Sequence, residues 1–345
     1  MKKNYIFTLL FLFNITVFYA QLTPLVDGLI DANRLHLEGD TLYFTDNESI
    51  FYIDINEENP TVTTLISGLA NPAGMAVKDD FMYVALFDSA QVVKLNLTQT
   101  NPSPILVTTS GDSPNMLEIY GNDLYYTNNA IGIIYKYDLT GGSNSADFFL
   151  GPYPGVIGLD VKDDVLYFTQ STLGRMHKIS LLDPDAEAEE ILTGINWPIG
   201  IEFKDNDLYM ASLTTGKIVK ANALENPIVV EDVLTSLNLP RDITFDGDVM
   251  YVLEDDVLSK IDLSLSVDEF SNIDFKIFPN PATNYLKLTN KDKLDYTIYD
   301  SRGRTIKSGT VFPNDQIDVS SLSQGHYHIK CIGKSSSIVK KFIKQ

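Results

Sequence analysis

The sequence predicts an all-β protein, a six-bladed β-propeller followed by a small immunoglobulin-like β-sandwich. Three observations lead to this prediction. A short phrase built around a tyrosine recurs six times, and alternating strand patterns without a helical period fill each repeat, which is typical of four-stranded propeller blades. The composition then changes from acidic to basic after residue 274. The repeated tyrosines are Tyr43, Tyr83, Tyr125, Tyr167, Tyr209 and Tyr251, spaced by 40 residues once and by 42 residues four times.

The first 20 residues predict a secretory signal peptide. Lys2 and Lys3 precede an apolar run that is too short and wrongly flanked for a membrane span, and Ala20 precedes the expected cleavage point. No other stretch could cross a bilayer, so we expect no transmembrane segment. The single cysteine, Cys331, allows no intrachain disulfide. We therefore expect an exported protein that is held together by packing.

Residues 21–266 predict the propeller. Each repeat reads as an inner strand, an Asp, Asn or Gly turn, the tyrosine strand, a third strand and a fourth strand. The tyrosines suit a crowded interface between blades, so we interpret them as structural. The sixth repeat ends after "VLSKIDLS" (257–264) without a fourth strand, whereas "QLTPLVDGL" (21–29) resembles the fourth strand of the first repeat. We expect residues 21–29 to complete the last blade, which would close the ring and leave no exposed edge there.

The repeats also carry a family resemblance. The segments "NPAGMAV…MYVA" and "WPIGIEF…LYMA" resemble NHL repeats, and "LYFTDN" resembles the YWTD repeats of receptor propellers. The resemblance implies the six-bladed fold. Such folds include ligand-binding scaffolds, lactone hydrolases and lyases, so the fold does not determine the function.

The propeller and the tail carry opposite charge. After an acidic linker at 267–274, residues 275–345 hold twelve Lys and Arg against five Asp, a formal charge of +7. Residues 21–274 hold twelve basic and 41 acidic residues, a formal charge of −29. Such an acidic propeller would repel phosphates, so we expect no nucleic-acid partner.

The tail at 275–345 predicts a β-sandwich of alternating strands between Gly, Pro and Asn turns. Its motifs, in order, resemble the C-terminal sorting domain of type IX secretion cargo. The residues that match are Pro279, Asn280, Pro281, Asp300, Gly303, Gly325, Tyr327, Lys340, Lys341 and Lys344. The resemblance implies passage through the periplasm, recognition of the tail by the type IX translocon, and a secreted or cell-surface location. The alternative is an accessory sandwich that binds carbohydrate.

Propeller ligands bind at a channel mouth, and we expect the site where the inner strands begin and the tyrosine strands end. The candidate ligand-binding residues are Arg34 and Asp242 at the first position, and Asp46, Asn128, Gln170 and Glu254 at the second. At the first of these positions three blades carry a glycine (Gly74, Gly158 and Gly200), and we expect these glycines to leave open space. Arg34 and Asp242 would meet where the ring closes, either as a surface ion pair between blades or as a substrate clamp.

Two residues further along the inner strand, three consecutive blades carry an acid. The position holds His36, Ala76, Glu118, Asp160, Glu202 and Thr244 in blades one to six. Crowded like charges cost free energy unless water or a cation compensates them, and calcium prefers oxygen ligands. Glu118, Asp160 and Glu202 are therefore candidate calcium ligands, and the alternative is a wet channel of solvated acids.

These observations favour an exported, non-catalytic propeller that binds a small molecule, a glycan or a protein. The chain shows no nucleophile elbow, no phosphate-binding glycine loop and no Cys/His metal spacing. The alternative is a metal-dependent hydrolase or lyase of the lactonase type. A bound metal together with turnover of lactones would distinguish the alternative from the binding module.

Overall fold

The structure is a computed structural model, and it shows two compact units, Met1–Leu265 and Ser266–Gln345. The described residues are 22–109, 112–141, 145–183, 185–225, 227–265, 276–289, 293–300, 304–313, 315–332 and 337–345. The predicted signal peptide (1–20), the linker (267–274) and Gly303 lie outside them. Among the described residues, no helix combines the length and the apolar character needed to span a membrane.

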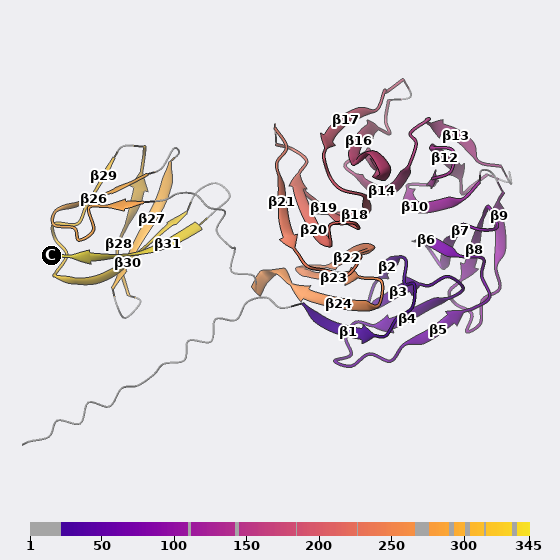
Figure 1. Ribbon diagram of the computed structural model, residues 1–345, viewed down its shortest axis with the longest axis horizontal. Coiled ribbons are helices and arrows are strands. Elements are labelled where there is room, and N and C mark those ends of the chain that lie inside the picture. The colour runs from indigo at the N-terminus through magenta and orange to yellow at the C-terminus, as the bar shows by residue number, and fades with distance from the viewer. Residues whose placement is uncertain are drawn as a thin grey trace, which may run out of the picture. The chain divides into compact units, whose positions relative to one another are not determined.

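The first unit is a six-bladed β-propeller, as the sequence predicted (Figure 1). Six four-stranded antiparallel sheets surround a central axis, and the first strand of each repeat lies innermost. The innermost strands are β2 (Leu35–Glu38), β6 (Pro72–Lys78), β10 (Pro114–Tyr120), β14 (Val156–Lys162), β18 (Pro198–Lys204) and β22 (Asp242–Asp246). The tyrosine strands are β3 (Thr41–Thr45), β7 (Phe81–Leu86), β11 (Asp123–Asn128), β15 (Val165–Gln170), β19 (Asp207–Ser212) and β23 (Val249–Leu253).

The outer half of each blade completes the sheet. The third strands are β4 (Ile50–Asp54), β8 (Gln91–Asn96), β12 (Ile133–Asp138), β16 (Arg175–Ser180), β20 (Lys217–Asn222) and β24 (Val257–Asp262). The fourth strands of blades one to five are β5 (Thr63–Ile66), β9 (Ile105–Thr108), β13 (Asp147–Leu150), β17 (Glu189–Thr193) and β21 (Val230–Leu234). The 3₁₀ helices η1 (Ser171–Leu173) and η2 (Leu263–Leu265) are short.

The ring closes as predicted. Strand β1 (Thr23–Asp27) pairs antiparallel with β24, and the sixth sheet has the order β1-β24-β23-β22. Leu25, Val26 and Leu29 pack against the buried cluster shared by the first and sixth blades. The N-terminal strand is therefore the outer strand of the last blade, and it covers an edge that would otherwise be unpaired.

The apolar core lies between neighbouring blades, where facing sheets pack. Five of the six repeated tyrosines are buried, and Tyr43 is half-buried. Tyr167 and Tyr209 make edge-to-face contacts with Phe203 and Phe245 of the next blade, with centroid distances of 4.7 and 4.9 Å. Such contacts stabilise blade packing, which agrees with the structural role predicted for the tyrosines.

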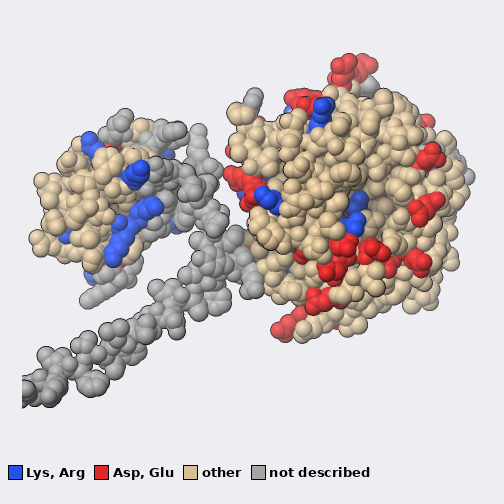
Figure 2. Space-filling view, viewed as in Figure 1, with Lys and Arg blue, Asp and Glu red and all other residues tan. Residues whose placement is uncertain are grey.

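The second unit is a small two-sheet β structure with its own core around the fully buried Phe342. One sheet has the order β25-β26-β29 and the other β28-β27-β30-β31. Its strands are β25 (Ile277–Phe278), β26 (Tyr285–Leu288), β27 (Leu294–Asp300), β28 (Thr305–Val311), β29 (Gln316–Asp318), β30 (Gly325–Ile332) and β31 (Ser337–Lys344). On the face in Figure 2, acidic side chains predominate on the propeller and basic ones on this unit.

The motif residues of the tail hold this unit together. Asn280 accepts a hydrogen bond from the Ile343 amide (3.0 Å) and donates to the Lys341 carbonyl (3.3 Å), which ties the first turn to the last strand. Asp300 pairs with Arg304 at 2.7 Å, and Tyr327 packs on Phe342. In β31, Lys340 and Lys341 are exposed, whereas Lys344 is buried.

Candidate functional site

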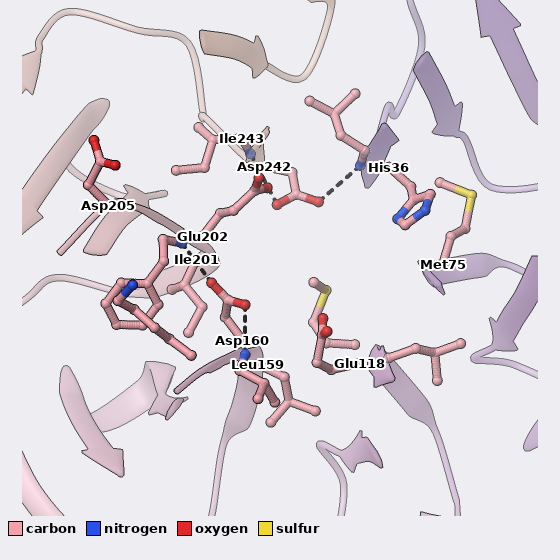
Figure 3. Close-up of a pocket in the computed structure, with 16 residues that line it drawn as sticks. His36, Met75, Glu118, Leu159, Asp160, Ile201, Glu202, Asp205, Asp242 and Ile243 are labelled. Carbon is pink, nitrogen blue, oxygen red and sulfur yellow. Dashed lines mark hydrogen bonds between the residues drawn. The ribbon is translucent and has the colours of Figure 1, made fainter. Parts of the chain in front are cut away.

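A cavity of about 410 Å³ follows the axis of the propeller between the innermost strands (Figure 3). Its walls include Met75, Met116 and Ile201. The polar lining residues are His36, Glu118, Asp160, Lys162, Glu202, Asp205 and Asp242. Asp205, in the turn after β18, has a side chain that is 90% exposed. The cavity therefore opens on the face where the innermost strands end.

Strand register brings four of the predicted site residues to one level of the channel. His36, Glu118, Asp160 and Glu202 each lie opposite the repeated tyrosine of their own blade. Because the blades repeat around one axis, equal register means equal depth. Asp242 lies two residues earlier on its strand than this level, and it also lines the cavity.

Two of the acids join neighbouring blades through their backbones. Asp160 accepts hydrogen bonds from the amides of Val161 and Phe203, each at 2.6 Å, so it bridges blades four and five. Asp242 does the same at the closure of the ring, where its carboxylate accepts from Ile243 (3.1 Å) and from Leu35 of blade one (2.9 Å). These bonds are drawn in Figure 3. The two carboxylates therefore have a structural role in addition to lining the cavity.

Burial shifts the ionisation of the acidic groups. Burial raises the pKa of Asp160 to about 7 and that of Asp242 to about 6, although amide hydrogen bonds act in the opposite direction. Burial also raises the pKa of Glu118 and Glu202 well above the ordinary value, and the nearby charge of Asp160 raises both further. Glu202 accepts a hydrogen bond from the Thr244 hydroxyl at 3.2 Å. These carboxyl groups therefore keep their protons to a higher pH in the folded protein than they would in water.

His36 faces the same cavity from blade one. Burial lowers its pKa to about 4, so the imidazole is neutral at pH 7. Its Nε2 atom is buried without a hydrogen-bond partner, and the Glu38 carboxylate is 4.0 Å away, beyond hydrogen-bond distance. Figure 3 shows the ring beside Met75, between the strands that carry the two residues. A buried nitrogen without a partner can serve a ligand that enters the cavity.

Arg34 covers the other end of the channel. Its side chain reaches from blade one to blade three, where Nη2 donates to the Asn115 Oδ1 atom at 2.7 Å and Nε lies 2.9 Å from the Met116 sulfur. Arg34 is only 4% exposed. The predicted surface ion pair with Asp242 is wrong, because Arg34 is buried and no ion pair joins the two among the described residues. The Asp242 carboxylate instead binds backbone amides, and its charge acts on Arg34 from a greater distance.

Gly74, Gly158 and Gly200, near the beginning of their innermost strands, do not leave open space, contrary to the expectation from the sequence. A Cβ atom on Gly74 would lie 2.5 Å from the Asn115 carbonyl oxygen of the next blade. The corresponding distances are 2.5 Å to a backbone oxygen for Gly158 and 2.1 Å to the Asp242 carboxylate for Gly200. These glycines allow neighbouring innermost strands to approach closely.

The four candidate residues at the ends of the tyrosine strands do not line the cavity. Asp46 accepts bonds from the Glu48 and Ser49 amides, at 2.8 and 2.6 Å, and so closes a turn. Gln170 is buried and contacts His177 at 2.8 Å. The remaining two, Asn128 and Glu254, are also buried and accept amide hydrogen bonds within the loops of this face. All four hold loops in place on the face that Arg34 covers.

Sequence reasoning missed the residues at the open end of the cavity. Lys162 ends β14 and Asp205 follows β18. Both therefore lie outside the repeat positions that were predicted to form the site. The signal that could have found them is their place in the repeat, at the turn between the innermost and the tyrosine strand. The Asp, Asn and Gly residues of that turn are typical of any β-hairpin, so the sequence alone did not mark the turn as part of a site.

The acids show a limited fit to a metal ion. Both oxygens of Asp160 accept amide hydrogen bonds, which leaves it less free to coordinate. In the described part of the chain, no three His, Cys, Asp or Glu side chains are placed to hold one metal ion. Calcium binding by Glu118, Asp160 and Glu202 therefore stays a prediction that requires a titration.

Comparison with known proteins identifies the tail. Residues 276–345 match the family model described as a secretion system C-terminal sorting domain. No curated protein matches the chain in sequence. The tail is thus a sorting domain, and the type IX resemblance of its motifs is consistent with this match.

Solved structures resemble the propeller at low sequence identity. A luciferin-regenerating enzyme is 13% identical with a TM-score of 0.58, and the match covers 70% of this chain and 95% of that one. An inactive virginiamycin B lyase from Staphylococcus aureus, solved with quinupristin, is 18% identical with a TM-score of 0.52, over 67% and 80% of the two chains. A nidogen–laminin complex gives 14% identity and a TM-score of 0.51, over 60% and 80%. At these identities the likeness establishes the fold alone.

Proposed function

We propose that this protein is an exported binding module that takes up a small polar ligand in the axial cavity of its propeller. The observation that carries the proposal is the cavity itself, about 410 Å³ in volume and lined by acids from three consecutive blades together with His36. A concave site with a few converging polar groups is where a ligand is expected to bind. A volume of this size suits a small molecule.

The chemistry of the cavity favours a ligand with an amino or other cationic group. Burial disfavours the charged forms of Glu118 and Glu202 and raises the pKa of both well above the ordinary value. A cation in the cavity would reverse that preference, since an opposite charge nearby favours the carboxylate. Binding would then release protons and strengthen as the pH rises through the pKa of Asp160, about 7. His36 can add a hydrogen bond through its unpartnered Nε2.

Export is the second part of the proposal. The sorting-domain match at residues 276–345 supports delivery by a secretion system, and the motif order supports the type IX system. In this proposal a signal peptide at 1–20 directs the chain to the periplasm, and the translocon recognises residues 275–345. The protein would then act outside the cell or on its surface.

The binding module is preferred over a metal-dependent hydrolase or lyase for a geometric reason. A lactonase-type enzyme holds a divalent metal with several well-placed acid and amide ligands. Asp160 is already engaged with two amides, and among the described residues no three His, Cys, Asp or Glu side chains are placed to hold one metal ion. The carboxyl groups that remain are better suited to an organic cation.

The test is a thermal-shift screen of the mature chain against small molecules that form matched pairs with and without an amino group. We expect only the amino members to stabilise the protein. The double variant Glu118→Gln/Glu202→Gln should lose this response, whereas Glu58→Gln/Glu187→Gln, which changes two exposed acids outside the cavity, should keep it. Equal stabilisation of the two double variants would refute the cavity as the binding site.

A further inference from the structure

The loops that enter the six blades share a backbone feature that the sequence pattern did not show. In each of them, one residue shortly before the innermost strand adopts a left-handed conformation. These residues are Asp31 (φ 53°), Asn71 (56°), Ser113 (52°), Gly155 (75°), Trp197 (49°) and Leu239 (51°). They repeat with the same spacing as the tyrosines. The left-handed turn is therefore part of the blade design.

Two blades place an unsuitable residue in this turn. Asp, Asn and Gly tolerate a positive φ, whereas a bulky side chain there is strained. Trp197 and Leu239 occupy the turn in blades five and six, and they are 40% and 41% exposed. Burial therefore offsets the strain only in part. Strained residues of this kind concentrate at functional sites, which directs attention to what the two side chains contact outside the propeller.

Backbone hydrogen bonds join the loops of blades five and six to one another. The Leu213 amide donates to the Trp197 carbonyl at 3.2 Å, and the Leu237 amide donates to Gly216 at 3.0 Å. The loop that carries Leu239 is thus joined to the hairpin beside Trp197.

Further hydrogen bonds join these loops to the loop that enters the first blade. The Asn238 side chain donates to the Asp256 carboxylate at 3.1 Å, and the Leu29 amide donates to the Asp256 carbonyl at 3.0 Å. Ile30, next to Leu29, is 77% exposed. We call Ile30, Trp197 and Leu239 the loop patch. It precedes the innermost strands, so it lies on the face opposite the opening of the cavity.

The charges around the loop patch are acidic. Asp31 and Asp256 are exposed beside it. The nearby cations are already paired, since Arg241 contacts Asp255 at 2.5 Å and Lys217 contacts Asp232 at 2.7 Å. A partner that meets this surface therefore finds apolar side chains bordered by uncompensated negative charge. Complementary charge steers such a partner and selects against acidic ones.

We propose that the loop patch docks a polypeptide segment that presents an apolar or aromatic side chain between lysines or arginines. The apolar group packs on Trp197 and Leu239, and the basic groups lie against Asp31 and Asp256. Trp and large aliphatic residues at the centre of an interface commonly supply most of its binding energy. This site is independent of the axial cavity, from which Arg34 separates it.

The first test uses a synthetic peptide, Lys-Phe-Lys-Leu-Lys, and its acidic counterpart, Glu-Phe-Glu-Leu-Glu. Trp197 is the only tryptophan of the chain, so its emission reports directly on the loop patch. We expect the basic peptide to shift that emission in the mature full-length protein, with an affinity that weakens as salt rises. The acidic peptide should produce no shift. Failure of the basic peptide to bind at ~1 mM, or equal binding of both peptides, would overturn the proposal.

The second test compares variants with fluorescently labelled basic peptide. Trp197→Asn and Leu239→Asn should each weaken binding by about fivefold or more. Leu182→Asn, which changes a 70% exposed leucine in the turn after β16, is the matched control and should have no effect. An equal loss in the control would mean that the peptide binds nonspecifically and would overturn the proposal.

Stability separates a docking role from a structural one. Asn71 occupies the same left-handed turn in blade two, so Asn at position 197 or 239 should leave the melting midpoint unchanged or raise it. A midpoint lowered in step with peptide binding would indicate that the residues only hold the fold. The remaining alternative is that a second copy of the chain occupies the loop patch, and sedimentation velocity tests for such a dimer. A dimer that Leu239→Asn dissociates, without peptide binding, would overturn the peptide proposal in favour of self-association.

Discussion

The acid-lined cavity should make the propeller less stable as the pH rises, and replacing two of its acids should remove much of that dependence. The variant is Glu118→Gln/Glu202→Gln. Burial raises the pKa of both groups in the folded state, so the folded protein keeps protons that the unfolded chain has released. The stabilising contribution is complete below the unfolded pKa, near 4.5, and is lost as the pH rises toward the folded pKa.

The size of the effect follows from proton linkage. Each proton that the folded state retains lowers the free energy of unfolding by about 1.4 kcal/mol for each pH unit of increase. Two such protons would give ~3 kcal/mol per pH unit, and water in the cavity reduces this by screening the carboxylates. Between pH 5 and 7 we therefore expect the parent protein to lose about 2–3 kcal/mol more than the double variant.

Urea unfolding from pH 5 to 8 measures the difference. Trp197 lies in the propeller and is the only tryptophan, so its fluorescence follows that unit without a signal from the tail. The control is Glu58→Gln/Glu187→Gln, in which the acids are exposed and the pH profile should match the parent. Parallel profiles for the parent and the cavity variant would show that the cavity acids ionise freely, and they would refute the burial argument.

Three further predictions follow from the closure of the ring, the tail and the acids. Deleting residues 21–29 should destabilise the propeller by about 5 kcal/mol, because four backbone pairings and three half-buried apolar side chains are lost; a thermal midpoint equal to that of a nine-residue deletion in the tail would contradict it. Removing residues 275–345 should leave a folded propeller that accumulates in the periplasm, and normal levels in the medium by immunoblot would contradict the export proposal. If Glu118, Asp160 and Glu202 bind calcium, a hundredfold excess over the dissociation constant should stabilise the propeller by about 2.7 kcal/mol, and a midpoint unmoved by millimolar calcium would eliminate that ion.

The repeat explains why so much of the fold could be predicted from the sequence. A period of 42 residues fixes the register of each innermost strand against its tyrosine strand. Glu118, Asp160 and Glu202 therefore had to lie at one depth, and the structure places them there. The strand that closes the ring was predictable for the same reason, since an incomplete last blade requires a partner.

The open end of the channel could not be predicted, because it depends on one long side chain. Arg34 could have pointed toward Asp242, its neighbour across the closure, or across the axis. It reaches Asn115 and Met116, two blades away, and covers that face. A single sequence contains no information on which of several acceptors a flexible guanidinium will select. The residues predicted to contact a ligand on that face instead form hydrogen bonds within loops, and the cavity opens at the other end of the channel.

The six blades serve as controls for one another, and this separates structure from function more sharply than burial does. A residue type that recurs in all blades, such as the tyrosine, is explained by blade geometry. A departure that costs stability requires another cause. Three blades carry half-buried acids that line the cavity where blade two has Ala76, and two blades carry bulky residues where blade two has Asn71. The two sets lie toward opposite ends of the channel, so the two proposed sites should be separable by mutation.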